Sequence, residues 1–339
     1  MTLESVFSHA AAFLPVLLFL MALWVLDSYK LVERSRIVYA ILAGALAALA
    51  SYFVNTAAFQ AYPEQALHYS YFGAPVVEEL LKGAYWIFLI ITIRAAFMVD
   101  AGICGFAVGA GFALVENFFY LHGLEVKGIG VSILRGFGTA LMHGTVAAVA
   151  AMISIFMNER FKWKAPWQFV PGLLLAIAIH SSFNWGLLSP IATTVTILVS
   201  MPLLLFGVFF WSEHSMRRWL GDKLDNDLEV LNMIATGEFQ DSRAGAYLRS
   251  LQDRFPDEIR ADMLCMMQLT IELSARAKGV LMLREAGIEP PPDPDLDAQF
   301  EEMAYLQKSI GRTGLLAVAP LLSQTPRDLW EMRRLAQGR

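Results

Sequence analysis

Charged residues are scarce in this chain of 339 residues. Asp, Glu, Lys and Arg make up only 17% of the sequence, whereas hydrophobic residues make up 56%, and the mean hydropathy is +0.50. Soluble domains carry about 25% charged residues, so this composition lies far from theirs. The sequence therefore predicts a protein that lies largely within a lipid bilayer.

Basic surface and cysteine are also lacking. The formal net charge is −5, with the acidic surplus in the C-terminal third, which argues against binding to nucleic acid. The two cysteines, Cys104 in an apolar stretch and Cys265 in a polar one, cannot form a disulfide framework and have no metal-ligand spacing. Thiol chemistry is therefore disfavoured.

Long apolar stretches are abundant before residue 212. A helix needs roughly 20 apolar residues to cross the hydrocarbon core, and seven stretches are long enough. They lie near 10–29, 37–59, 75–94, 98–121, 131–157, 166–188 and 191–211. The first stretch has no basic segment before it and is long enough to span, so we expect it to remain as a helix. The sequence predicts an all-α, polytopic transmembrane bundle of about seven spans.

Basic residues are distributed unevenly between the loops. The loops after the first, third, fifth and seventh spans contain Lys30, Arg34, Arg36, Arg94, Arg160, Lys162, Lys164, Arg217, Arg218 and Lys223. The opposite loops contribute only Lys127. Because cytoplasmic loops carry the excess of Lys and Arg, we expect the N-terminus outside and the C-terminus in the cytoplasm.

The composition changes abruptly at residue 212. Polar and charged residues then alternate with amphipathic helical patterns, and helix-start signals occur at Pro256-Asp257, Asp295 and Thr325-Pro326. The stretch from Gly287 to Pro294 is predicted to be a linker. We therefore expect a membrane core at 1–211 and a cytosolic α-helical domain of unknown role at 212–339.

Ionisable residues inside a bilayer are expected to be functional, because each costs about 2.5–3.5 kcal/mol on insertion scales. The third span begins with Glu78, Glu79 and Lys82. Lys82 is four residues from one acid and three from the other, so it can neutralise one of them on the same helical face. The second acid is then available as a general base that acts on water.

Three further spans carry buried polar candidates. They are Glu116 in the fourth span, His143 in the fifth, and His180 and Asn184 one turn apart in the sixth. In the predicted topology these groups and the two acids of the third span lie in the outer half of the membrane, with His143 somewhat deeper. The sequence thus predicts one shared cavity near the extracytoplasmic face.

Each of these residues also has a structural interpretation when it is taken alone. Glu79 with Lys82 could be an interfacial ion pair, Glu116 could extend to the membrane surface, and a single His or Asn often bridges two helices. Their matched depth favours a functional site over separate structural roles. Gly105 and Gly109, four residues apart in the fourth span, are interpreted as packing residues that permit close helix approach.

The motifs Glu78-Glu79-x-x-Lys82, Phe112-x-x-x-Glu116, His143 and His180-x-x-x-Asn184 resemble those of the PrsW family of intramembrane proteases. That family is similar to the ABI and prenyl-protein protease clan. The resemblance covers roughly residues 70–190. Asn184 stands where Asp is common in PrsW-like chains, and the prenyl-protease relatives carry His in place of Glu116.

The resemblance implies hydrolysis of peptide bonds in a membrane-anchored protein at the extracytoplasmic face of a bacterial cell membrane, as in site-1 cleavage of an anti-sigma factor. It implies that Glu78 activates water, that Glu116 or His143 assists it, and that His180 and Asn184 stabilise the oxyanion. Glu79 would orient the site through Lys82.

A metal requirement is left open by the sequence. Glu79, Glu116, His143 and His180 could hold Zn²⁺ with an open position for water, yet no HExxH spacing is present, and a metal-free glutamic mechanism is equally compatible.

Two other functions compete with the protease. Buried acids and histidines also serve proton-coupled transporters, although no inverted repeat is evident here. A non-catalytic membrane sensor or scaffold is the third interpretation. The expected partners are the bilayer, a membrane-anchored protein substrate and a cytosolic partner of residues 220–339.

Overall fold

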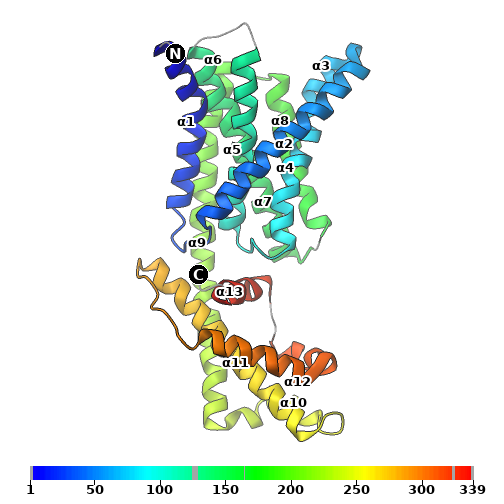
Figure 1. Ribbon diagram of the computed structural model, residues 1–339, viewed down its shortest axis with the longest axis vertical. Helices are drawn as coiled ribbons and strands as arrows, with labels where there is room; N and C mark the ends of the chain where they lie inside the picture. The colour runs from blue at the N-terminus through cyan, green and yellow to red at the C-terminus, as the bar shows by residue number, and fades with distance from the viewer. Residues whose placement is uncertain (1–2, 124–128, 164, 323–324, 337–339) are drawn as a thin grey trace. The chain divides into compact units, whose positions relative to one another are not determined.

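The computed structural model describes residues 3–123, 129–163, 165–322 and 325–336. All regular elements in these ranges are helices, which confirms the predicted all-α class (Figure 1). The chain divides into two compact units, Met1–Glu213 and His214–Arg339. The division falls within one long helix, and each unit is described by itself below.

The first unit is built from long helices joined by short turns. The helices are α1 (Leu3–Val25), α2 (Arg34–Ala61), α3 (Ala66–His68), α4 (Ala74–Ile91), α5 (Met98–Gly123), α6 (Ile129–Leu134), α7 (Leu141–Phe161), α8 (Val170–Trp185) and the first part of α9 (Pro190–Thr236). Two π-helical segments, η2 (Tyr69–Gly73) and η3 (Arg135–Ala140), lead directly into α4 and α7. Short 3₁₀ turns, η1 (Pro63–Gln65) and η4 (Trp167–Phe169), precede α3 and α8.

Each of the seven predicted spans overlaps one of these helical stretches. Among the residues that the structure describes, five stretches are long and apolar enough to cross a membrane: α1, α2, α5, the continuous run 129–161 and α9. Helix α8 has only 16 residues, and α4 carries the three charged residues of the predicted site. Several membrane-spanning helices are thus supported, and the number seven stays a prediction.

Helix α5 forms the centre of the first unit, between α2 and α7 (Figure 1). Its glycines explain the close packing. A Cβ atom on Gly109 would lie 2.1 Å from the backbone oxygen of His143, and one on Gly105 would lie 2.6 Å from that of Ala147. The sequence interpretation of these two glycines as packing residues agrees with this geometry, since the α5 and α7 backbones approach too closely for any side chain at either position.

Helix α9 is longer than the seventh predicted span. It continues past residue 211 to Thr236, where Gly237 adopts a left-handed conformation with φ of 81°. No proline occurs between residues 212 and 236, so the change in composition removes no backbone donor from the helix. The polarity of the sequence changes at residue 212, but the backbone remains helical.

The second unit contains the rest of α9 and four further helices. These are α10 (Arg243–Ser250), α11 (Asp257–Glu285), α12 (Leu296–Leu322) and α13 (Pro326–Ala336), with a 3₁₀ turn, η5 (Glu238–Asp241), before α10. The three predicted helix starts and the predicted linker from Gly287 to Pro294 are confirmed. Met263, Leu273 and Val318 are fully buried in its core.

Candidate active site

Helix α4 positions both acids of the first motif. Glu79 and Lys82 are 2% and 0% exposed, and Lys82 Nζ lies 2.5 Å from Glu79 Oε1. The three-residue spacing on one helix therefore forms an ion pair, as the sequence predicted for one of the two acids. Glu78 is the acid left without this lysine, and its side chain is partly exposed.

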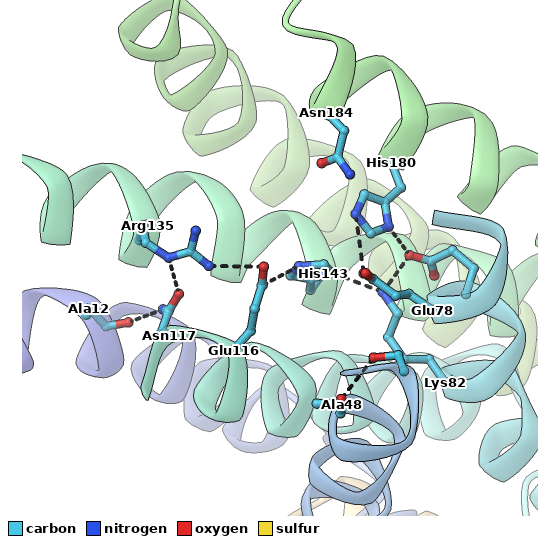
Figure 2. Close-up of polar contacts among 12 residues, drawn as sticks. Ala12, Ala48, Glu78, Lys82, Glu116, Asn117, Arg135, His143, His180 and Asn184 are labelled. Carbon is cyan, nitrogen blue, oxygen red and sulfur yellow. Dashed lines mark hydrogen bonds and ion pairs between the residues drawn. The ribbon is translucent and has the colours of Figure 1, made fainter. Parts of the chain in front are cut away.

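His180 on α8 contacts both of these acids (Figure 2). Its Nδ1 lies 2.7 Å from Glu79 Oε1, and its Nε2 lies 3.7 Å from Glu78 Oε2. An ionised carboxylate can only accept a hydrogen bond. In a neutral His180 the proton therefore lies on Nδ1, and this N–H donates a hydrogen bond to Glu79. The Nε2 atom then faces Glu78 with its lone pair.

His143 on α7 connects the lysine to the third acid. Lys82 Nζ lies 3.0 Å from Nδ1 of His143, and Nε2 of His143 lies 2.9 Å from Glu116 Oε2. An ammonium group only donates, so Nδ1 accepts and Nε2 donates to Glu116. The His143 and His180 rings are nearly perpendicular, with centroids 4.8 Å apart.

Glu116 on α5 has a cationic neighbour of its own. Arg135 Nη2, from the π-helical segment η3, lies 3.2 Å from Glu116 Oε1. Arg135 Nε also donates to Asn117 Oδ1 at 2.8 Å, and Asn117 Nδ2 donates to the backbone oxygen of Ala12 at 2.8 Å. Figure 2 shows this chain of contacts leading from α1 to His143.

Asn184 lies one turn from His180 on α8, but its amide is engaged elsewhere. Its Nδ2 donates to the backbone oxygen of Ser70 at 3.1 Å. Ser70 belongs to η2, the π-helical segment that precedes the α4 acids. Asn184 therefore holds this segment against α8, whereas the other five predicted site residues contact one another through the bonds described above.

Sequence reasoning missed two residues of this cluster. Asn55 on α2 donates from Nδ2 to Glu78 Oε1 at 3.2 Å, and Arg135 pairs with Glu116. Both lie within predicted apolar spans, so the cost of burying a polar group was the signal that could have found them.

Donor atoms suited to a metal come together in this cluster. Within the part of the chain that the structure describes, one group of at least three such residues is found: ligand atoms of Glu78, His143 and His180 lie within 4.8 Å of one another. Two imidazoles and a carboxylate are the donor set of many catalytic zinc sites. The group differs from the set named from the sequence, because Glu79 and Glu116 bind the histidines and Glu78 takes their place.

The carboxylates bound to the two histidines also match the usual surroundings of metal ligands. Ligating histidines usually donate their second N–H to a carboxylate, which fixes the ring. Glu79 does this for His180, and Glu116 does so for His143. Nδ1 of His143 accepts a hydrogen bond from Lys82, so a metal at this atom would replace the ammonium contact.

A helical bundle with apolar, membrane-length helices and a buried Glu–His–Lys cluster is consistent with an intramembrane hydrolase. The family model of the "PrsW family intramembrane metalloprotease" matches residues 33–211, which is more than half of the chain. The chain belongs to this family and is an intramembrane protease, and the recognition from its motifs is confirmed. No curated protein and no solved structure matches the chain significantly.

Proposed function

We propose that the chain hydrolyses a peptide bond of a membrane-anchored protein by activating water at Glu78. The charge pairing of the three acids supports this most directly. Glu79 pairs with Lys82 and Glu116 pairs with Arg135, whereas Glu78 contacts the amide of Asn55 and the imidazole of His180. An acid without a cationic partner is the best placed of the three to exchange a proton with water.

In this proposal Glu78 takes a proton from the attacking water and returns it to the leaving amine. In the metal-free form of the proposal, His180 binds a second proton from solvent at Nε2 and donates it as a hydrogen bond to the oxyanion, and the Glu79 carboxylate stabilises the resulting imidazolium through Nδ1. Asn184 acts as a second oxyanion donor only if it exchanges its bond to Ser70 for one to the substrate.

In the metal-dependent form of this proposal, Glu78, His143 and His180 would instead serve as ligands of a divalent metal, for which Zn²⁺ suits the donors best. When bound, such a metal supplies a Lewis acid that polarises the peptide carbonyl and makes water more acidic. Glu79 and Glu116 then keep the two imidazole rings in the orientation that binding needs. A metal-free glutamic mechanism uses the same water position beside Glu78.

The proposed substrate is a single-pass membrane protein cut near the extracytoplasmic face, with a membrane-anchored anti-sigma factor as the candidate class. The sorting of basic residues into alternate loops supports this side of the membrane. Residues 220–339 are proposed to lie in the cytoplasm, where they can bind a further partner.

Cleavage of a single-pass reporter, tagged at both ends and expressed with the full chain, tests the function. Glu78→Gln and His180→Ala are expected to abolish cleavage while the amount of folded protein in the membrane stays the same. Glu64→Gln and His68→Ala are matched controls, because both residues are exposed and outside the cluster. Cleavage retained by both site variants would contradict the proposal.

A further inference from the structure

Asn55 and Tyr69 connect helix α2 to the Glu78 carboxylate. Asn55 Nδ2 donates to Glu78 Oε1 at 3.2 Å, and the Tyr69 hydroxyl donates to Asn55 Oδ1 at 2.9 Å. We propose that Asn55, oriented by Tyr69, is a positioning residue that fixes the Glu78 carboxylate for proteolysis. This inference rests on the proposed role of Glu78 in activating water.

The Glu78 carboxylate fixes which end of the Asn55 amide faces it, because an ionised carboxylate can only accept. An asparagine side chain offers an acceptor oxygen at one corner and two N–H donors at the other. The NH₂ group of Asn55 therefore faces Glu78, and Oδ1 accepts a hydrogen bond from the Tyr69 hydroxyl, which holds the amide in this orientation. The reversed amide would place its oxygen against a carboxylate oxygen, which is repulsive. Tyr69 therefore acts on Glu78 through Asn55.

The hydrogen bond from Asn55 makes the two oxygens of Glu78 unequal. Oε1 accepts from Asn55, while Oε2 is the oxygen nearest to Nε2 of His180, at 3.7 Å. Holding Oε1 limits rotation of the carboxylate, so Oε2 stays directed toward the imidazole. Mutating a residue that hydrogen-bonds a functional side chain in this way typically lowers metal affinity or activity about ten- to a hundredfold.

The position of Tyr69 is itself closely determined. A Cβ atom on Gly73 would lie 2.3 Å from Cδ2 of Tyr69, so glycine leaves the space that the ring occupies. Phe59 packs edge-to-face against this ring, with centroids 5.3 Å apart. The bond from Asn184 to Ser70 holds the same π-helical segment from the other side. These contacts place the hydroxyl at Asn55.

Burial gives a second reason to assign Asn55 a role in the site. Asn55 is 9% exposed and lies within a long apolar helix. A polar side chain in a membrane helix is costly unless it is hydrogen-bonded, and here both its donor and its acceptor are used within the cluster. Leucine, of similar size, would suit an apolar position better if packing were its only task.

The test compares Asn55→Leu, Tyr69→Phe and the double variant in the full chain, with kcat and KM measured on a reporter that the wild type cleaves. We expect Asn55→Leu to lower kcat about ten- to a hundredfold with KM nearly unchanged. Tyr69→Phe should cause a smaller loss, and no further loss in the Asn55→Leu background, because it acts through Asn55.

Thr56→Val and Tyr52→Phe are the matched controls on the same helix and should keep the wild-type kcat. Binding of Co²⁺, followed by its visible absorption, gives a readout independent of turnover. The affinity for Co²⁺ should be lower in Asn55→Leu than in the wild type, as kcat is. Equal Tm values for all variants would show that a loss of kcat comes from the position of Glu78 and not from altered folding.

Three outcomes would overturn the inference: an unchanged kcat for Asn55→Leu, additive losses in the double variant, or an equal loss in the controls. Each of these leaves the proposed function intact if Glu78→Gln remains inactive. A wild-type chain that cleaves no reporter and binds no Co²⁺ would instead overturn the proposed function, and the inference with it.

Discussion

Glu79 accepts a hydrogen bond from His180 across two helices, with 2.7 Å between Oε1 of the glutamate and Nδ1 of the histidine. The same oxygen is 2.5 Å from Lys82 Nζ, so one buried carboxylate contacts both the lysine and an imidazole. This shared anion explains why two adjacent acids are present. Glu79 balances charge and orients His180, which leaves Glu78 available for water.

The first prediction concerns this buried ion pair. Removing one partner leaves an uncompensated charge, which in buried pairs costs about 3–5 kcal/mol. Lys82→Met is therefore expected to destabilise the protein by about that amount, whereas the double variant Glu79→Gln/Lys82→Met should be more stable than Lys82→Met alone. Unfolding by SDS in mixed micelles measures the difference. Equal stability of the single and double variants would refute the pairing.

The second prediction concerns the contact between α5 and α7. Alanine at position 109 would place Cβ 2.1 Å from the backbone oxygen of His143, so α7 must move away. Gly109→Ala should therefore lower both Tm and cleavage, because the shift displaces His143 itself. Gly207→Ala is the control, since a Cβ there meets no atom within 4 Å. Wild-type cleavage by Gly109→Ala would show that the two helices tolerate a wider spacing.

Hydrophobic pattern and burial cost predicted much of this protein. Apolar length located the helical stretches, and helix-start signals located α11, α12 and α13, because both depend on local sequence. The cost of burying charge selected Glu78, Glu79, Glu116 and the two histidines without any structure. Spacing on one helix also predicted a Lys82 ion pair.

Contacts between different helices could not be predicted in the same way. From spacing alone, either Glu78 or Glu79 could pair with Lys82. The structure shows that Lys82 pairs with Glu79, and the packing of α8 adds a hydrogen bond from His180 to the same acid. The resemblance to the PrsW family implies that Asn184 stabilises the oxyanion together with His180. The bond from Asn184 to Ser70 depends on a π-helical segment, which has no clear sequence signal.

The third prediction concerns the metal. If Glu78, His143 and His180 hold a divalent ion, elemental analysis of the purified chain should find about one metal per chain, and a chelator should remove both metal and cleavage. Zn²⁺ added back should restore activity. His143→Ala should lose the metal, whereas His68→Ala, an exposed histidine, should keep it. Full cleavage by chelated, metal-free protein would favour the glutamic mechanism instead.

The fourth prediction concerns pH and the second unit, where Lys278 lies between two acids. Its Nζ is 2.7 Å from Glu331 Oε1 and 2.9 Å from Asp227 Oδ2, so one cation faces two carboxylates. Glu331 is the more deeply buried acid, at 1% exposed, and its Oε2 has no hydrogen-bond partner among the described residues. Burial raises the pKa of Glu331 to about 7, although Lys278 opposes this rise.

A raised carboxyl pKa means that the folded state binds the proton more tightly than the unfolded state. The stability that this proton provides is present below the unfolded value of 4.5 and is lost as the pH rises toward 7. The loss is at most roughly 3–4 kcal/mol, at 1.36 kcal/mol for each pKa unit. Glu331→Gln, which mimics the neutral acid, should flatten this part of the pH profile in urea unfolding of the full chain, followed by circular dichroism. Asp297→Asn, on a different helix, is the control, and a wild-type slope retained by Glu331→Gln would assign the pH dependence to other groups.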